Sequence, residues 1–124
     1  MPLSCLSWQK DDLRGATVTQ HELQSVLREY GNGLRRILGD TLDGVLLYGS
    51  QARGDASIRS DIDVLCVVRG PFDFGELVEQ TSEMTSVLCL KYDVVISRTF
   101  AGKDDLETLD LPLYMNIRRE GIPI

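Results

Sequence analysis

The segment that decides the fold is LLYGSQARGDASIRSDIDVLCVV, residues 46–68. It begins with an apolar run, turns at Gly49-Ser50, and ends in a second apolar run that carries Asp61 and Asp63. An apolar strand that ends in a turn of small residues can leave backbone N–H groups free to hold a phosphate. Carboxylates at positions i and i+2 of a strand point to the same face. The segment therefore predicts a phosphate-binding turn beside a site for a divalent cation.

Two common loop types are excluded by the residues of this segment. Residues 49–54 have the G-x-x-x-x-G spacing of a P-loop, but Asp-Ala follows them where a P-loop requires Lys and then Ser or Thr. A calcium-binding loop that began at Asp61 would need Gly at its sixth position and Glu at its twelfth. Cys66 and Phe72 stand at these positions, so the calcium loop is excluded as well.

The composition is that of one globular domain. The chain has 124 residues, of which 43% are hydrophobic and 26% are charged, and its formal net charge is −6. An acidic chain lacks the clustered Lys and Arg that non-specific nucleic-acid binding requires, so we expect no strong nucleic-acid binding. Nucleotides remain compatible with this charge, because a bound divalent cation supplies positive charge locally. No apolar stretch is long enough for a membrane span, so we expect no membrane partner.

The cysteines indicate a reducing compartment. Cys5, Cys66 and Cys89 are odd in number and widely spaced, which is neither a disulfide framework nor a zinc-binding pattern. The N-terminus lacks the basic and apolar regions of a signal peptide. We therefore expect a cytoplasmic protein with reduced thiols.

Hydrophobic periodicity predicts an α/β (α+β) domain with the order α-β-α-β-α-β-α around a small mixed β-sheet flanked by helices. Residues 1–18 show no clear period and are interpreted as an N-terminal extension, and residues 19–124 as the domain. A turn is expected at residues 103–105, followed by a short helical piece. The expected helices cover residues 20–38, 51–53 (the start of a short helix), 73–88 and 112–120, and the expected strands cover 44–48, 61–68 and 90–97.

A third carboxylate, Asp93, lies within the expected strand 90–97. Asp93 on a strand next to Asp61 and Asp63 would complete a cluster of three like charges. Such a cluster is costly without a metal ion, so a purely structural role is a poor explanation for it. Mg²⁺ prefers carboxylate and phosphate oxygens, and two such ions can clamp the attacking and leaving oxygens of a phosphoryl-type transfer.

The combined pattern resembles the nucleotidyltransferase superfamily that includes DNA polymerase β. Its signature is Gly-Gly or Gly-Ser, a spacer of about ten residues, and then Asp-apolar-Asp-apolar, which Gly49-Ser50 and residues 61–64 match. Two segments resemble the bacterial minimal nucleotidyltransferases that are often paired with HEPN-domain proteins. They are YGSQARGDASIRSDIDV, residues 48–64, and the C-terminal residues 116–121. The resemblance covers about residues 40–124.

The resemblance implies a role for each motif residue. Asp61 and Asp63 would hold two Mg²⁺ ions, and Asp93 would ligate the ion on the nucleophile side and help deprotonate the acceptor. Gly49 and Ser50 would hold the β- and γ-phosphates. Two further residues complete the implied nucleotide-binding set, with a local structural role as the alternative for each: Arg53 and Ser60.

The resemblance also implies a function. We expect a metal-dependent nucleotidyltransferase that moves NMP, AMP from ATP in the first instance, to a hydroxyl group of a partner protein. The implied partner is a HEPN ribonuclease toxin, with this chain as the antitoxin, in a homo- or hetero-oligomer. Two alternatives stay open: an enzyme that modifies a small molecule, as aminoglycoside nucleotidyltransferases do, and a non-catalytic antitoxin that acts by binding alone.

Overall fold

The sheet is mixed and has four strands in the order β4-β3-β2-β5. A computed structural model describes residues 20–53 and 61–124 of the chain. The strand β3 pairs antiparallel with β2 and parallel with β4. The short strand β5 pairs antiparallel with Leu46 and Leu47, near the C-terminal end of β2. The bounds are β2 (Leu42–Tyr48), β3 (Ile62–Val68), β4 (Ile96–Gly102) and β5 (Ile122–Pro123).

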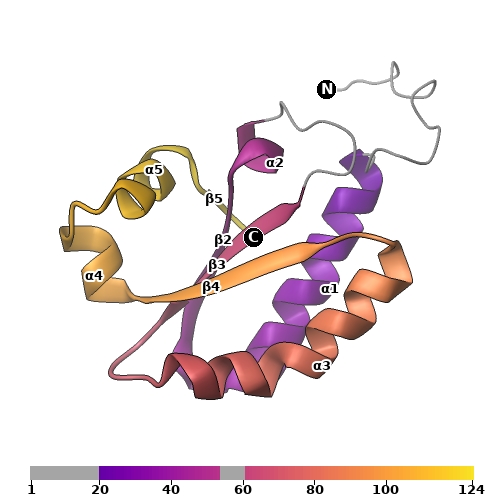
Figure 1. Cartoon of the computed structure of the whole chain (residues 1–124), viewed down its shortest axis with the longest axis horizontal. Helices are drawn as coiled ribbons and strands as arrows, with labels where there is room; N and C mark the ends of the chain where they lie inside the picture. Colours follow the sequence, from indigo (N-terminus) through magenta and orange to yellow (C-terminus); the bar gives the residue numbers. More distant parts are fainter. Residues whose placement is uncertain (1–19, 54–60) are drawn as a thin grey trace.

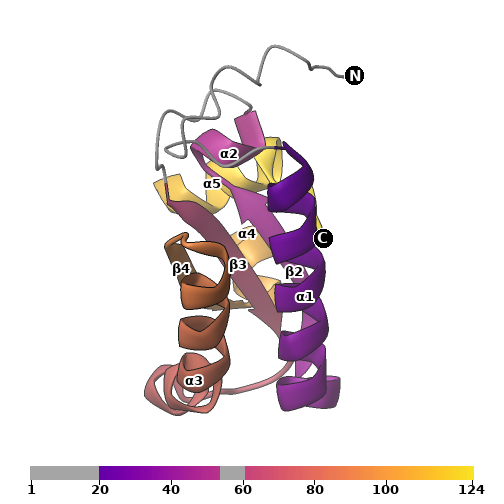
Figure 2. The same cartoon turned by 90° about the vertical axis from the view of Figure 1, so that its right-hand side faces the viewer.

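Helices cover both faces of this sheet. Figure 2 shows α1 and α3 side by side on one face, with α4 and α5 on the other. The short helix α2 follows directly after β2, at the upper end of the sheet in Figure 1. The bounds are α1 (Gln20–Leu38), η2 (Gly39–Thr41), α2 (Ser50–Arg53), α3 (Phe74–Tyr92), α4 (Lys103–Thr108) and α5 (Pro112–Glu120).

The larger core lies between the sheet and the pair α1–α3. Alternate residues of a strand share a face, and the set Ile62, Val64, Cys66 and Val68 of β3 is wholly buried on this side. A polar contact joins α1 to α3 within this core, because the Tyr30 hydroxyl lies 2.9 Å from Thr85 Oγ1.

The smaller core lies on the opposite face, under α4 and α5. Leu65 and Val67 of β3 pack there with Leu106 of α4 and Ile117 of α5. Asp63 of β3, and Asp61 just before the strand, precede Leu65 at alternate positions, so the aspartates belong to the face that α4 and α5 cover. The expected fold class is confirmed.

Several expected elements agree closely with the structure. The helices expected over 20–38 and 112–120 are α1 and α5 with the same bounds, and the helical start at residues 51–53 is α2. The strand expected over 44–48 begins earlier, at Leu42, with a bulge between Leu42 and Gly44. The N-terminal extension, residues 1–18, lies outside the described residues.

The strand expected over residues 90–97 is wrong. The helix α3 continues to Tyr92, and its end is set by Asp93, which adopts a left-handed conformation (φ 55°) while its N–H bonds to the Cys89 carbonyl. The strand β4 begins only at Ile96. An apolar run bounded by polar residues fits a buried strand or the last turn of a helix equally well by sequence pattern. Asp93 therefore lies at a helix terminus and not inside a strand.

Two C-terminal features also differ from the expectation. Residues 103–105 are the first turn of α4 and not a separate turn before it. The strand β5 was not expected, because two residues carry no periodic signal. Within the described residues, no helix is long and apolar enough to cross a membrane.

Candidate active site

The carboxylates of Asp61 and Asp63 stand at the N-terminal end of β3. Asp61 directly precedes the strand and is exposed, and Asp63 is its second residue and is half-buried. Both lie on the face covered by α4 and α5, as the i, i+2 spacing predicts. Two carboxylates therefore lie close together at the end of the sheet where β3 begins.

The turn after β2 brings Gly49 against one of these carboxylates. Tyr48, the last residue of β2, pairs across the sheet with Asp63, so the next residue is held beside the same side chain. Gly49 has φ +79°, and a β-carbon built there would collide with Asp63 Oδ2. Only glycine satisfies both the backbone angle and the close approach.

The electrostatics of the pair favour a bound cation. Burial raises the pKa of the Asp63 carboxyl above its ordinary value, and the neighbouring charge of Asp61 raises it further. Burial also raises the pKa of the Tyr48 hydroxyl, with a second contribution from Asp63. Both pKa values are raised because a negative charge at these positions is poorly solvated. A bound divalent cation would offset the free-energy cost of that charge. The donor set, two carboxylates on one face, fits Mg²⁺.

A row of side chains across three strands was missed by sequence reasoning. Tyr48 of β2, Asp63 of β3 and Ser97 of β4 are neighbours in register. The Ser97 hydroxyl donates a hydrogen bond of 3.3 Å to Asp61 Oδ2. A correct start of β4 at Ile96, paired in parallel with Ile62, would have placed Ser97 in this row.

Asp93, the third expected carboxylate, is not brought into this group. Among residues 20–53 and 61–124, no three His, Cys, Asp or Glu side chains are grouped closely enough to hold a metal ion. Asp93 instead lies at the end of α3, where both its own N–H and that of Val94 bond to the Cys89 carbonyl.

The expected nucleotide-binding residues are only partly described. The backbones of Ser50 and Arg53 belong to α2, directly after the Gly49 turn. The side-chain contacts expected for these two residues, and Ser60 as a whole, lie outside the described residues. The nucleotide-binding role of the three stays a prediction.

Arg118 has a structural role that its sequence position does not reveal. Its guanidinium donates to the carbonyls of Leu106 and Leu109 at 2.7 and 2.8 Å, and to Asp110 Oδ1 at 2.9 Å. It therefore ties α5 to the C-terminal end of α4, whose last carbonyls have no partner within the helix. Arg119 contacts only its own helix in the described hydrogen bonds, through Asn116 Oδ1.

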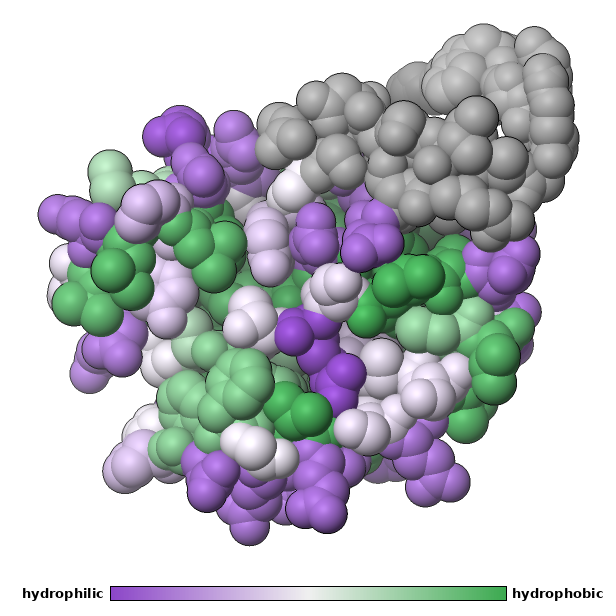
Figure 3. All heavy atoms as spheres, in the orientation of Figure 1, coloured by the Kyte–Doolittle hydropathy of each residue, from purple (hydrophilic) through white to green (hydrophobic). Residues whose placement is uncertain are grey.

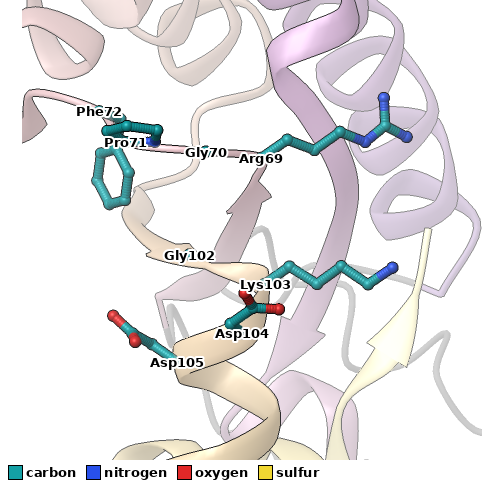
Figure 4. Close-up of a pocket in the computed structure, with 8 residues that line it drawn as sticks. All are labelled: Arg69, Gly70, Pro71, Phe72, Gly102, Lys103, Asp104 and Asp105. Atoms are coloured by element: carbon teal, nitrogen blue, oxygen red, sulfur yellow. The ribbon is translucent and has the colours of Figure 1, made fainter.

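A cavity of about 570 Å³ lies at the other end of the sheet, where β3 and β4 end. It is about 20 Å from the aspartates, the length of a seven-residue strand. Figure 4 shows Arg69 and Lys103 extending to the same side, away from Phe72. Both cations face Asp43, at 3.1 and 3.9 Å. Asp43 does not line the cavity, so both cations are paired outside it, and we assign the cavity no ligand.

Two comparisons of the sequence with known proteins find relatives over most of the chain. A family profile described as "Nucleotidyltransferase domain" matches residues 27–119. A protein of Methanocaldococcus jannaschii, named as a candidate protein adenylyltransferase, is 38% identical over 76 residues, which are 61% of this chain and 76% of that protein.

Solved structures share the fold. A minimal nucleotidyltransferase superposes with a TM-score of 0.54 and 20% identity, covering 82% of this chain and 95% of that one. A toxin–antitoxin structure with AMP-PNP superposes with a TM-score of 0.51 and 20% identity, covering 75% of this chain and 70% of that one.

Proposed function

Because this chain belongs to the nucleotidyltransferase domain family, we propose that it transfers AMP from ATP to a hydroxyl group of a partner protein. The observation that carries the proposal is the placement of Asp61 and Asp63 on one face, directly beside the Gly49 turn. The relative from M. jannaschii, which is named for the same activity on proteins, supports adenylyl transfer.

Asp61 and Asp63 would hold the metal ions of this reaction. Mg²⁺ bound there would neutralise charge on the triphosphate. The two carboxylates would orient the cations from one side of the sheet, and the absence of a β-carbon at Gly49 makes room for the Asp63 carboxylate. Backbone N–H groups of the turn at residues 49–50 would hold the terminal phosphates.

The reaction joins the acceptor oxygen to the α-phosphorus of ATP. The bond from that phosphorus to the oxygen bridging to the β-phosphate breaks, and pyrophosphate leaves. The acceptor hydroxyl loses its proton to a carboxylate, and we retain Asp93 as the candidate for this role. Asp93 would act from its place at the end of α3, outside β4.

Exposed apolar residues on the face of the sheet that carries the aspartates support a protein acceptor. Figure 3 shows apolar side chains, interspersed with hydrophilic ones, on the side of the molecule where α4 and α5 lie. The residues in this region that are 41–50% exposed are Leu109, Leu111, Leu113 and Met115. Exposed apolar surface of this kind is typical of protein contacts.

We propose a HEPN ribonuclease toxin as the partner and an antitoxin role for this chain. Support comes from the sequence resemblance and from the shared fold with a toxin–antitoxin structure. Two alternative functions are compatible with the same fold: modification of a small molecule, and inhibition of the partner by binding alone. In either case the partner protein would remain unlabelled in the test below.

The test uses the protein encoded by the adjacent gene as the acceptor. It is incubated with this chain, Mg²⁺ and ATP labelled at the α-phosphate, and label on the partner is measured. We expect labelling by the wild type and none by the double variant Asp61→Asn/Asp63→Asn. If both proteins bind and inhibit the partner but leave it unlabelled, the chain acts by binding and the transferase proposal is wrong.

A further inference from the structure

Ser97 lies beside both aspartates of the site. It is the second residue of β4 and pairs in parallel with Asp63, while its hydroxyl donates to Asp61 Oδ2 at 3.3 Å. From this geometry we propose that Ser97 is a positioning residue, which holds the Asp61 carboxylate in the orientation that lets Asp61 and Asp63 share a cation. The inference rests on the proposed function and adds a residue to it.

Within residues 20–53 and 61–124, the Ser97 hydroxyl is the group that hydrogen-bonds to the Asp61 side chain. Asp61 precedes β3 and is exposed, whereas Asp63 is half-buried within the strand and packed against the Gly49 turn. An exposed carboxylate that is free to rotate loses conformational entropy when it binds a cation. A hydrogen bond that already fixes the carboxylate reduces that loss, as is common for the groups that support metal ligands.

A serine hydroxyl is suited to this task for two reasons. A carboxylate has about four lone-pair positions, so one hydrogen bond to Oδ2 leaves the others for a cation. The hydroxyl is also neutral, and it therefore adds no negative charge beside a pair of carboxylates that already repel each other.

If Ser97 had a purely structural role, loss of its hydroxyl would lower the melting temperature and leave cation binding unchanged. The bond to Asp61 is long and exposed, so its net contribution to folding is small. The backbone pairing of β3 with β4 does not depend on the side chain. Loss of the hydroxyl should therefore weaken cation binding and leave the melting temperature nearly unchanged.

The test measures Mn²⁺ binding to the full chain by electron paramagnetic resonance, with Mn²⁺ as the probe for the divalent site. We expect Ser97→Ala to weaken binding about tenfold, at the lower end for residues that support metal ligands. Ser97→Thr keeps the hydroxyl and should retain most of the affinity. Thr99→Ala removes a hydroxyl from the next position on the same face of β4, and we expect wild-type affinity from it.

A second variant protects the test against a folding defect. Ser97→Val has the strand preference of Thr but no hydroxyl, so the difference between Ser97→Thr and Ser97→Val isolates the hydrogen bond. Melting temperature and far-UV circular dichroism are recorded for each variant. Equal Mn²⁺ affinity for Ser97→Thr, Ser97→Val and the wild type would overturn the inference.

The proposed function and this inference fail in distinguishable ways. Asp63→Asn should abolish Mn²⁺ binding if the aspartates form the metal site. If wild type and Asp63→Asn bind Mn²⁺ equally, or neither binds it, the metal site is wrong and Ser97 has no role in it. If Asp63→Asn loses binding and the Ser97 variants do not, the inference about Ser97 alone is wrong.

Discussion

Gly49 lies so close to Asp63 that a β-carbon at position 49 would overlap the Oδ2 atom of the carboxylate. The contact joins the turn after β2 to the second residue of β3, which pairs with Tyr48 across the sheet. A change at the glycine should therefore alter the carboxylate pair as well as the local backbone.

Gly49→Ala should reduce both stability and activity. The left-handed φ of +79° alone costs about 1–2 kcal/mol for a residue with a β-carbon, and displacement of Asp63 disturbs the cation site. The matched control is Gly39→Ala, because Gly39 also has a positive φ (+56°) but has no atom within 4 Å of a built β-carbon. We expect similar strain in both variants, measured by chemical denaturation, and loss of Mn²⁺ binding only in Gly49→Ala. Wild-type Mn²⁺ affinity in Gly49→Ala would contradict the close approach.

Asp63→Asn should stabilise the protein at neutral pH in the absence of divalent cations. The folded state raises the pKa of Asp63, so the folded protein holds its proton more tightly than the unfolded chain. Stability then falls as pH rises from the ordinary carboxyl pKa through the raised one, and the penalty persists at pH 7. Thermal melts should show a higher melting temperature for Asp63→Asn at pH 7, and a rise on adding Mg²⁺ for the wild type alone.

Asp43→Asn is the control for that experiment, with the opposite sign. The Asp43 carboxylate faces Arg69 at 3.1 Å and Lys103 at 3.9 Å, so its removal should destabilise the fold, by about 0.2–1 kcal/mol for exposed pairs. If Asp63→Asn melted below the wild type in the absence of metal, the surroundings would stabilise the Asp63 carboxylate, and the prediction would be wrong.

Arg118→Ala should destabilise the protein, whereas Arg119→Ala should not. Arg118 donates to two carbonyls and a carboxylate at the end of α4, and bonds from a charged donor contribute about 1.5–3 kcal/mol. Because part of this guanidinium is exposed, we expect a loss of about 1–2 kcal/mol by urea denaturation. Arg119 contacts Asn116 in its own helix, and its removal should cost less than about 0.5 kcal/mol. Equal effects of the two substitutions would refute the assignment of Arg118 as the link between α4 and α5.

Tyr30→Phe should weaken the pH dependence of stability above pH 10. Burial raises the pKa of Tyr30 to about 12, and the hydroxyl lies 2.9 Å from Thr85 Oγ1. Between pH 10 and 12 the unfolded chain loses the Tyr30 proton and the folded protein keeps it, so stability falls by roughly 1 kcal/mol per pH unit. Because Tyr30→Phe removes the hydrogen bond, its free energy of unfolding at pH 7 should be lower by about 1 kcal/mol. Its denaturation midpoint should fall less steeply than that of the wild type as the pH rises above 10. Burial also raises the pKa of Cys66 to about 12, and this contribution is common to both proteins. Parallel pH profiles for the two would contradict a buried, protonated Tyr30.

Much of the site could be predicted because its chemistry is local in the sequence. Gly49, Asp61 and Asp63 fall within one strand–turn–strand segment, and the i, i+2 spacing places both carboxylates on one face whatever else packs around them. The first and last helices could be predicted from apolar residues at helical spacing, and the structure confirms the bounds of α1 and α5.

The error over residues 90–97 shows where local pattern stops being informative. Leu90 is 84% exposed on the last turn of α3, yet in sequence it reads as the start of an apolar strand. Whether such a run continues a helix or starts a strand depends on which partner buries it, and that information is not in the run itself. The role assigned to Asp93 depended on this boundary.

The sequence by itself determined the fold class, the turn at Gly49 and the common face of Asp61 and Asp63, since backbone geometry and side-chain alternation follow from neighbouring residues. Only the tertiary structure decided the parallel register of β3 with β4, which places Ser97 beside Asp63, and the reach of Arg118 to the end of α4. The register of a strand depends on which of its faces is buried against the rest of the protein. These contacts therefore join residues that are far apart in the sequence, and no local sequence pattern predicts that they meet.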